Sequence, residues 1–465
     1  MELESLSGKI FEGDYRSRIY EKGITFHYQV HVPEYTGQCA LNVSCDGMNR
    51  SEAYAMQVLA QSGEVPYCIT VGVIQGRVCN GMGEGKDRYM RMGTYDMVNT
   101  DYPNFLVEEL IPFLVEKYDL NIYDHPDMHM TSGGSSGGIS AWNIAWQRND
   151  YFRRVYMSSP SFLAMGGGNE YPVLIRKYET KPIRVYVDYS ENEPDDYFGS
   201  SYCAALESIK ALKFAGYDMM SKYYPGEGHC SRKENVDSAI ERMRFLWKNW
   251  ETEPVTAKGL STRMQKVISA DCGWEKTCEQ FPKKNGAVSL GICSAAGEYT
   301  ATENEICFTP AGGEKRKVAE GFLKISALAL SADKRRLYIG DLDRGCVYAS
   351  LILPDGGLEG RFLHALLHHE PDYNHSGTID LCTSADDRVF AATELGIQLV
   401  RSFGLIDVIL SLPFGKVPEK IEFGETDRDY LYALADGTVY RRKILDGGRA
   451  VADQVYEPQN TSYFN

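Results

Sequence analysis

The sequence has little positive charge and no long apolar run. No stretch approaches 18 apolar residues, and the opening MELESLSGKIFEGDYRSRIY has neither the basic start nor the apolar core of a secretory signal. We therefore expect a cytoplasmic protein with no membrane partner. The 49 Lys and Arg are outnumbered by 64 Asp and Glu, for a formal net charge of −15. Because nucleic-acid binders carry basic surfaces, a nucleic-acid partner is not expected.

The sequence also lacks the cysteine patterns of metal and redox sites. Its 12 cysteines include no CxxC pair and no cysteine–histidine set with metal-ligand spacing. Several lie inside apolar runs typical of strands, such as Cys45, Cys68 and Cys382. We expect the cysteines to be reduced and buried, and we expect no metal or other cofactor.

What is present fits a globular protein of two domains. A chain of 465 residues, 43% of them hydrophobic, exceeds the usual size of a single core. Through residue 250, apolar strand-like runs alternate with segments of helical periodicity, which predicts an α/β domain with a mostly parallel sheet. The expected strands are 24–32, 40–45, 68–73, a run from Met128, 154–159, 183–189 and 219–224, and the expected helices are 104–118, 137–148, 202–214 and 235–250.

After a linker at 251–259, no long amphipathic helix follows. Three segments beginning at 325, 377 and 418 each read as strand, acidic turn, strand, glycine-containing turn and strand. Their spacing falls within the range of propeller blades, and a less regular copy precedes them. We therefore predict an α/β domain over 1–254 and a shortened, all-β propeller of about four blades over 255–465.

One motif indicates nucleophilic chemistry. Directly after the MHMT strand, Gly133-Gly134-Ser135-Ser136-Gly137 reads GxSxG, and the predicted helix follows without a break. A nucleophile elbow needs glycine two residues either side of the serine, because the turn from strand to helix is too tight for larger residues. The sequence therefore predicts Ser135 as a nucleophile.

A serine nucleophile needs a histidine base, and that histidine needs a carboxylate to orient it. His229 is the one histidine in the loop between the last predicted strand and the last helix, where the base of such a fold belongs. The carboxylate should follow the strand 183–189. Glu193 is the first choice and Asp195 the second, while the other candidates are Asp188, Glu191 and Asp196.

Two backbone amides should form an oxyanion hole. One belongs to the residue after the nucleophile, which is Ser136. The second is expected after the strand 40–45, where Cys45-Asp46-Gly47 forms a turn and Gly47 lets a backbone amide approach the substrate.

Residues 15–250 resemble the enterochelin esterase-like branch of the α/β-hydrolases, which is related to carbohydrate and feruloyl esterases. The resemblance rests on the early CDG, RMGTYD at 91–96, the elbow and its helix, YPVLIRK at 171–177, LKFAGYD and GEGH. It implies a serine esterase with Ser135, His229 and Glu193 as its triad. It also implies a substrate pocket that includes Asp46, Arg91 and Tyr95.

Residues 282–445 resemble a shortened gluconolactonase-like β-propeller, through LALSADKRRLYIGD, DDRVFAATELGIQLV and VYRRK. Relatives that bind a divalent metal use Glu, Asn and Asp, whereas Ser326, Ile379 and Lys420 stand at the corresponding turns here. We therefore expect this half to bind a substrate or a partner, and a homo-oligomer is one such arrangement.

These observations favour hydrolysis of carboxylic esters, with acylated sugars or aryl-acyl esters as small-molecule substrates. Three alternatives are a metal-dependent sugar lactonase in the propeller, a prolyl-oligopeptidase-like peptidase, and a non-catalytic binding protein that kept the hydrolase fold. The peptidase family places its propeller ahead of the hydrolase segment, whereas here the propeller follows.

Overall fold

The computed structural model divides the chain into two compact units. Unit 1 comprises 1–176 and 180–259, and unit 2 comprises 177–179 and 260–465. The residues that the structure describes are 6–20, 23–78, 88–230, 236–257, 259–269, 271–282, 290–294, 296–369, 378–424 and 429–445.

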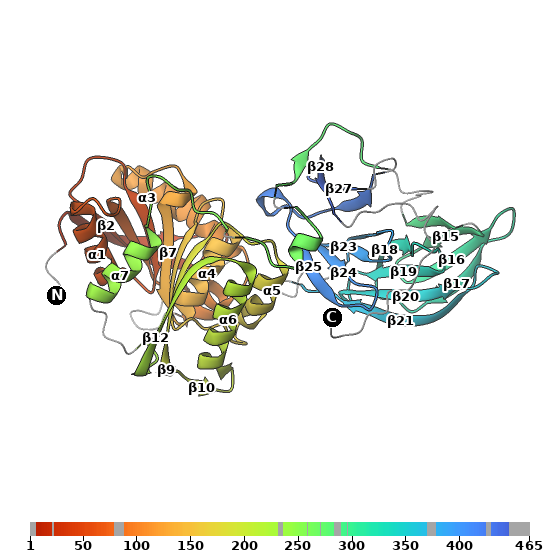
Figure 1. The fold of residues 1–465 in the computed structure, drawn as a ribbon, viewed down its shortest axis with the longest axis horizontal. Helices are drawn as coiled ribbons and strands as arrows, with labels where there is room; N and C mark the ends of the chain where they lie inside the picture. Colours follow the sequence, from red (N-terminus) through yellow and green to blue (C-terminus); the bar gives the residue numbers. More distant parts are fainter. Residues whose placement is uncertain are drawn as a thin grey trace. The chain divides into compact units, whose positions relative to one another are not determined.

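Unit 1 is built on a ten-stranded sheet in the order β12-β9-β8-β7-β3-β4-β2-β5-β6, with β1 paired to β2 (Figure 1). The pairs from β12 to β4 are all parallel, and β2 runs antiparallel to β4. The strands are β1 (Lys9–Arg16), β2 (Thr25–Val32), β3 (Ala40–Cys45), β4 (Cys68–Val73), β5 (Arg77–Val78), β6 (Arg88–Tyr89), β7 (His129–Gly134), β8 (Arg154–Ser158), β9 (Arg184–Asn192) and β12 (Asp218–Gly228).

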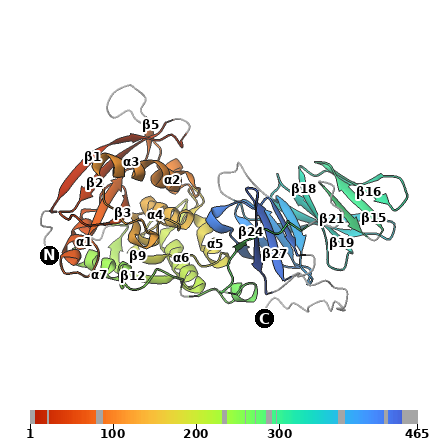
Figure 2. The same ribbon diagram turned by 90° about the horizontal axis from the view of Figure 1, so that it is seen from above.

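Helices cover this sheet as expected for strands that are apolar on both faces. On one face α1 and α7 pack against each other, and their apolar residues share a core with Met130, Tyr156 and Tyr186 of the sheet (Figure 2). Helix α4 packs on β3, β7 and β8, and α6 packs on β9 and β12. The α-helices are α1 (Arg50–Gln61), α2 (Asp101–Asn104), α3 (Ile111–Tyr118), α4 (Ser136–Gln147), α5 (Tyr171–Lys177), α6 (Ser201–Ala215) and α7 (Val236–Leu246).

The helix predicted over 104–118 is interrupted. The structure has α2, then a π-helical segment η2 (Phe105–Leu110), and then α3. Pro112 explains the interruption, since it has no amide hydrogen to donate to the preceding turn and its ring crowds that turn's carbonyl groups.

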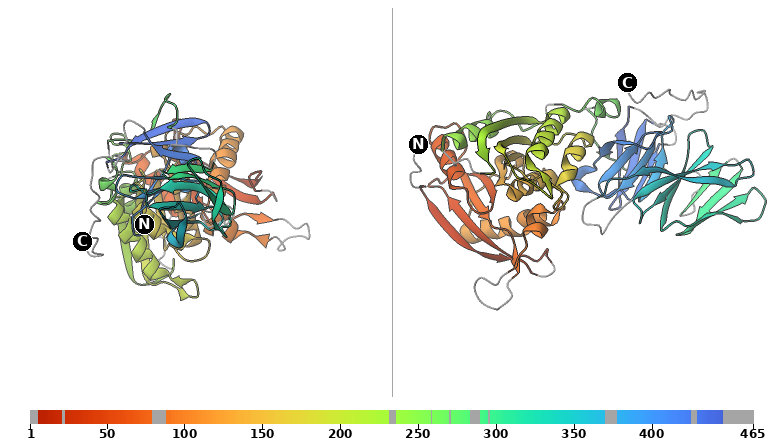
Figure 3. Two further views of the ribbon diagram at one scale, coloured as in Figure 1. Left: turned by 90° about the vertical axis from the view of Figure 1, so that its right-hand side faces the viewer. Right: turned by 90° about the horizontal axis from the view of Figure 1, so that it is seen from below.

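In the part of unit 2 that the structure describes, there are four small antiparallel sheets of four strands each, arranged as a propeller (Figure 3). In one sheet the early strand β13 pairs with β28 near the end of the chain, so the two ends of the unit share a blade. The α/β sheet of unit 1 followed by these antiparallel blades confirms the predicted fold class. The sheets are β14 to β17 (Gly291–Ser294, Gly297–Ala301, Glu305–Pro310, Arg316–Glu320), β18 to β21 (Ile325–Leu330, Arg336–Asp341, Cys346–Ile352, Leu358–Leu366), β22 to β25 (Asp380–Thr383, Val389–Thr393, Gly396–Val400, Ile406–Leu410), and β13 (Glu275–Lys276) with β26 to β28 (Lys420–Phe423, Tyr430–Ala435, Thr438–Lys443).

The described cysteines are all free thiols, and their burial varies. Cys45, Cys68 and Cys382 are buried as expected, whereas Cys203 and Cys230 are among those exposed to solvent. The expected burial was wrong for Cys203, Cys230, Cys278 and Cys293, which are exposed. Cys203 lies at a helix start and Cys230 in a loop, whereas Cys293 lies in β14, a strand with no buried residue. None of the helices in the described ranges has the length and apolar content needed to cross a membrane.

Candidate active site

Ser135 occupies a strained turn between β7 and α4. Its backbone has φ 55° and ψ −123°, a region that non-glycine residues rarely adopt. Strain of this kind costs about 1–3 kcal/mol and clusters at functional sites. A Cβ at Gly133 would lie 2.2 Å from the carbonyl oxygen of Gly137, so the spacing of the two glycines is a steric requirement.

The start of α4 also approaches the end of β3 closely. A Cβ on Gly137 would lie 2.9 Å from Oδ2 of Asp46 and 3.0 Å from Cβ of Cys45. Asp46 and Gly47 both have positive φ, at 66° and 94°. The turn predicted to carry an oxyanion donor therefore lies against the helix that begins at the nucleophile.

A segment that the sequence did not single out holds the elbow from the side of β8. The amide of Ser135 donates to Ser158 O at 2.9 Å, and the amide of Ser161 donates to Ser135 O at 3.1 Å. The hydroxyl groups of Ser135 and Ser161 lie 3.3 Å apart. A run of small polar residues after a strand that neighbours the elbow strand was the available signal for Ser161.

Glu193 and His229 form a close pair. Nδ1 of His229 lies 2.5 Å from Oε2 of Glu193, whose side chain is 1% exposed. Oε1 of Glu193 accepts hydrogen bonds from the Ser159 hydroxyl at 2.5 Å and from the Ser190 amide at 2.9 Å. Burial raises the pKa of Glu193, but the hydrogen bonds from His229, Ser159 and Ser190 outweigh it and lower the pKa overall. The carboxylate is therefore held ionised beside the imidazole.

The four other candidate carboxylates have different partners. Asp188 is buried in β9 and accepts a hydrogen bond from the Tyr156 hydroxyl at 2.9 Å. Glu191 accepts from the Gly226 amide at 2.6 Å. Asp195 and Asp196 are exposed on a hairpin formed by β10 (Asp195–Asp196) and β11 (Gly199–Ser200).

The loop that carries His229 lies beside the elbow, because Sγ of Cys230 is 3.4 Å from the position of a Cβ on Gly134. Within the described residues, the structure gives no hydrogen bond between Ser135 and His229. Contacts with the Cys230 side chain and with Glu193 raise the pKa of His229 to about 10.

This shift predicts the pH dependence of any reaction that uses His229 as a base. Only neutral imidazole accepts a proton, so turnover should rise with pH until about pH 10. Because contact with Cys230 is the larger cause, Cys230→Ala should move the rising limb to lower pH and increase kcat/KM at pH 7. A pH–rate profile measures this, with Cys293→Ala, another exposed cysteine, as control. An unchanged limb in Cys230→Ala would contradict the assignment.

The two predicted oxyanion donors differ in their present partners. Ser136 is the first residue of α4, where amides point away from the helix and have no partner within it. The Gly47 amide donates to Val73 O at 3.2 Å. The Gly47 amide could donate to a bound substrate only after its hydrogen bond to Val73 O is broken.

The predicted substrate residues Asp46, Arg91 and Tyr95 lie together. Arg91 forms two hydrogen bonds to the Asp46 carboxylate, at 2.5 and 2.9 Å, and both side chains are about one-third exposed. Tyr95 is 1% exposed, and its hydroxyl donates to Val73 O while accepting from the Asp46 amide at 2.9 Å. Tyr95 therefore supports the turn from inside, and the ion pair faces solvent.

The strand leading into the elbow is tied to α1 by a buried carboxylate. Glu52 is 0% exposed, and its Oε2 accepts hydrogen bonds from the Ser132 hydroxyl at 2.7 Å and from the side-chain Nδ2 of Asn42 at 3.1 Å. Arg242 of α7 lies 3.6 Å from Oε1 of Glu52, and it is also buried. Glu52, on α1, thus connects β3, β7 and α7. Its contact on β7 is Ser132, three residues before Ser135.

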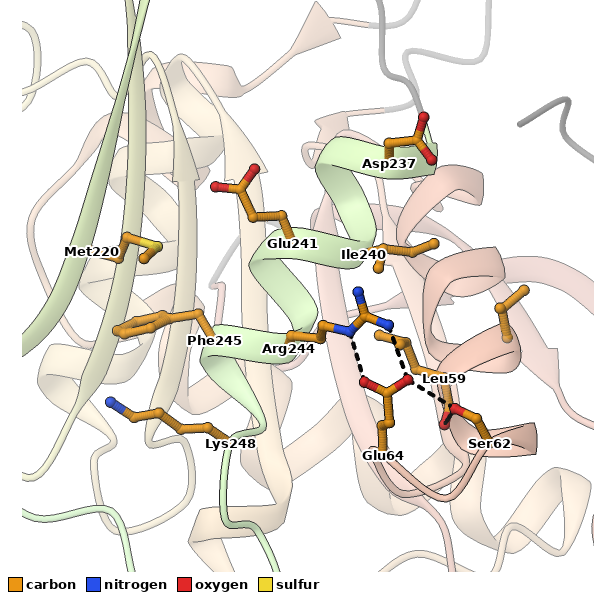
Figure 4. Close-up of a pocket in the computed structure, with 11 residues that line it drawn as sticks. Leu59, Ser62, Glu64, Met220, Asp237, Ile240, Glu241, Arg244, Phe245 and Lys248 are labelled. Atoms are coloured by element: carbon orange, nitrogen blue, oxygen red, sulfur yellow. Dashed lines mark hydrogen bonds and ion pairs between the residues drawn. The ribbon is translucent and has the colours of Figure 1, made fainter.

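An exposed ion pair between α7 and the turn after α1 offers a comparison. Arg244 of α7 bonds to Glu64 at 2.6 and 3.0 Å in the wall of a hollow of about 730 Å³ (Figure 4). The hollow is lined by residues of α1, α7 and β12 and their flanks, and it contains none of the predicted catalytic residues.

Glu52→Ala should destabilise unit 1 by about 3–5 kcal/mol, because it leaves a buried guanidinium without its carboxylate. Glu64→Ala should change stability little, since its ion pair is screened by water. Urea unfolding followed by circular dichroism measures both. Equal effects of the two substitutions would mean that Glu52 makes no special contribution to the core.

The positions in unit 2 that correspond to metal ligands in relatives carry other contacts. Ser326 donates to Thr378 O, and Ile379 packs against a hydrophobic cluster. Lys420 is exposed at the start of β26. Across the described ranges, no group of three or more His, Cys, Asp or Glu side chains could hold a metal ion.

Comparison with known families identifies the chemistry of unit 1. The model of the Esterase family, described as "Putative esterase", matches residues 26–194, a span that includes the elbow and Glu193. Residues 26–194 are thus similar in sequence to this esterase family. The chain is therefore an ester hydrolase. No curated protein matches the chain.

Solved structures with similar folds include esterases and a gluconolactonase. A ferulic acid esterase is 17% identical, with 52% of this chain and 99% of that chain covered and a TM-score of 0.40. The enterobactin esterase of Shigella flexneri is 16% identical, with 53% and 62% covered and a TM-score of 0.40. A gluconolactonase of Xanthomonas campestris is 15% identical, with 33% and 56% covered and a TM-score of 0.28.

Proposed function

We propose that this esterase cleaves carboxylic esters with Ser135 as nucleophile, His229 as general base and Glu193 as the residue that orients His229. The observation that carries the proposal is the pairing of a strained serine elbow with a carboxylate–imidazole pair in an adjacent loop. These are the parts that acyl transfer by a serine requires.

In the first half of the reaction, Oγ of Ser135 attacks the acyl carbon and its proton passes to Nε2 of His229. The alcohol departs with that proton, and an acyl group stays bonded to Ser135. Water then attacks the acyl carbon, again through His229, and releases the acid. Hydrogen bonds in the unliganded site are often long or misaligned, so the contact of Ser135 with Ser161 is compatible with this sequence.

The developing oxyanion would be held by backbone amides. Ser136 supplies one donor from the first turn of α4, where the helix dipole also favours negative charge. The turn at Gly47 supplies the second, once its bond to Val73 is exchanged.

The substrate that we propose is a small neutral ester, either an acylated sugar or an aryl-acyl ester. The family resemblance suggests both classes. The guanidinium of Arg91 is already neutralised by Asp46, which leaves it poorly suited to a polyanionic siderophore. Neither nucleic acid nor membrane is a proposed partner. Unit 2 is proposed to bind substrate or a partner rather than to catalyse.

Labelling with a fluorophosphonate probe tests the nucleophile directly. The wild-type chain should be labelled on Ser135, and Ser135→Ala should not be labelled. A panel of acetylated, feruloylated and lactone substrates then tests the reaction class. Absence of labelling together with absence of turnover would favour a non-catalytic binding protein.

A further inference from the structure

The hairpin β10–β11 presents two aromatic side chains to solvent. Tyr197 is 91% exposed and Phe198 is 38% exposed. Their ring centroids lie 4.4 Å apart at an interplanar angle of 46°. Leaving a tyrosine ring this exposed forgoes the free energy of burial, so an aromatic pair at a hairpin tip suggests a surface used for contact.

Both ends of this hairpin lie close to the proposed catalytic groups, one end in sequence and the other in space. On one side it begins two residues after Glu193, which bonds to His229. On the other side, a Cβ on Gly199 would lie 3.5 Å from Cδ2 of Leu163, two residues after the Ser161 that contacts Ser135. In Figure 1 the β10 label lies beyond the ends of β9 and β12.

These tethers limit how far Tyr197 can lie from the reacting centre. Tyr197 is four positions after Glu193, which bounds the distance between their Cα atoms at about 14 Å. Only Phe198 separates it from Gly199. The aromatic tip is therefore tethered close to the carboxylate that pairs with His229.

The charge of the hairpin restricts what it can bind. Asp195 and Asp196 are both exposed beside the two rings. The carboxylate of Asp196 accepts from the Phe198 amide at 2.8 Å, which fixes it at the tip. An anionic ligand would be repelled here, whereas an uncharged ring would lose nothing.

We propose that Tyr197, assisted by Phe198, forms a stacking subsite for an uncharged ring of the ester substrate. This inference rests on the proposed function and deepens it by assigning the ring a place. The substrate ring would present a flat or apolar face to Tyr197. It is either an aryl group on the acyl side of the ester or a pyranose on the alcohol side. Stacking needs the tyrosine ring and not its hydroxyl group.

The test compares three esters on the full chain. Ethyl acetate carries no ring, methyl ferulate carries one on the acyl side, and an O-acetylated xylopyranoside carries one on the alcohol side. Tyr197→Ala should lower kcat/KM for at least one ring ester relative to ethyl acetate by about threefold to tenfold, mainly through KM. The ring ester whose kcat/KM falls shows whether the stacked ring belongs to the acyl or the alcohol side of the substrate.

Two further variants separate stacking from other effects. Tyr197→Phe should keep the selectivity of the wild type, since the ring remains. Tyr35→Ala should leave all three rates unchanged. Tyr35 is 45% exposed in the loop before β3, at the amino-terminal ends of the parallel strands, whereas Ser135 and Glu193 lie at their carboxyl ends. If Tyr197→Ala keeps the wild-type selectivity for both ring esters, or if Tyr197→Phe loses it, the stacking subsite is wrong.

A binding measurement keeps this result independent of turnover. Calorimetric titration of Ser135→Ala with the two ring esters should give weaker binding of at least one of them when Tyr197→Ala is added. Equal affinities of the single and double variants for both esters would overturn the subsite. If Ser135 is not the nucleophile, labelling of the wild type fails while the calorimetric difference persists, so the two proposals fail separately.

Discussion

Replacing Ser135 with alanine is expected to lower ester turnover by several orders of magnitude while the fold persists. The hydroxyl is the proposed nucleophile, and loss of one member of a catalytic set generally removes most of its rate enhancement. The substitution should cost little stability, because alanine fits where serine stood and the backbone hydrogen bonds to Ser158 and Ser161 still hold the strained turn. Steady-state kinetics and far-ultraviolet circular dichroism measure both quantities.

Ser161→Ala is the matched control for this experiment. It removes a hydroxyl 3.3 Å from that of Ser135 without removing the proposed nucleophile, so its effect on turnover should be far smaller. If Ser135→Ala keeps more than about a tenth of the wild-type kcat, the nucleophile is another residue.

The elbow could be predicted from sequence because its requirements are local. The steric conflict between a Cβ at Gly133 and the carbonyl of Gly137 involves residues four apart, so it appears directly as glycine spacing. The predicted strand before it and helix after it correspond to β7 and α4. The same locality explains why the repeat spacing after residue 320 predicted the blades.

The partners of the elbow could not be predicted in this way. Ser159 and Ser161 reach Glu193 and Ser135 only because β7, β8 and β9 are neighbours in the sheet. Their serine-rich segment has no spacing that distinguishes it from an ordinary turn. The ion pair of Glu52 with Arg242 joins residues 190 positions apart, so no sequence pattern signals it.

Among the five acidic residues between 188 and 196, the sequence ranked Glu193 first but left the others open. The structure pairs Glu193 with His229, and three hydrogen bonds hold its carboxylate in a buried position. Asp195 lies two residues further on and is exposed. The distinction depends on which carboxylate in the loop points inward to His229 and Ser159, and no sequence pattern reports that orientation.

Glu193→Gln is therefore expected to lower kcat by about 10³–10⁴-fold, because an amide cannot hold His229 in the tautomer that accepts a proton at Nε2. It should also lower the pKa of His229, since the carboxylate is one of the two contacts that raise it to about 10. The rising limb of the pH–rate profile should accordingly move to lower pH even as its height falls.

Asp195→Asn is the control, since it makes the same change of charge on an exposed residue of the same loop and should alter kcat by less than about twofold. Glu193→Asp should retain more activity than Glu193→Gln, because it keeps the negative charge although it shortens the reach to Nδ1. Mild and equal losses in Glu193→Gln and Asp195→Asn would show that neither carboxylate orients the base. In that case Asp188, buried beneath the same strand end, becomes the residue to replace next, because it is the remaining carboxylate that the sheet holds in place.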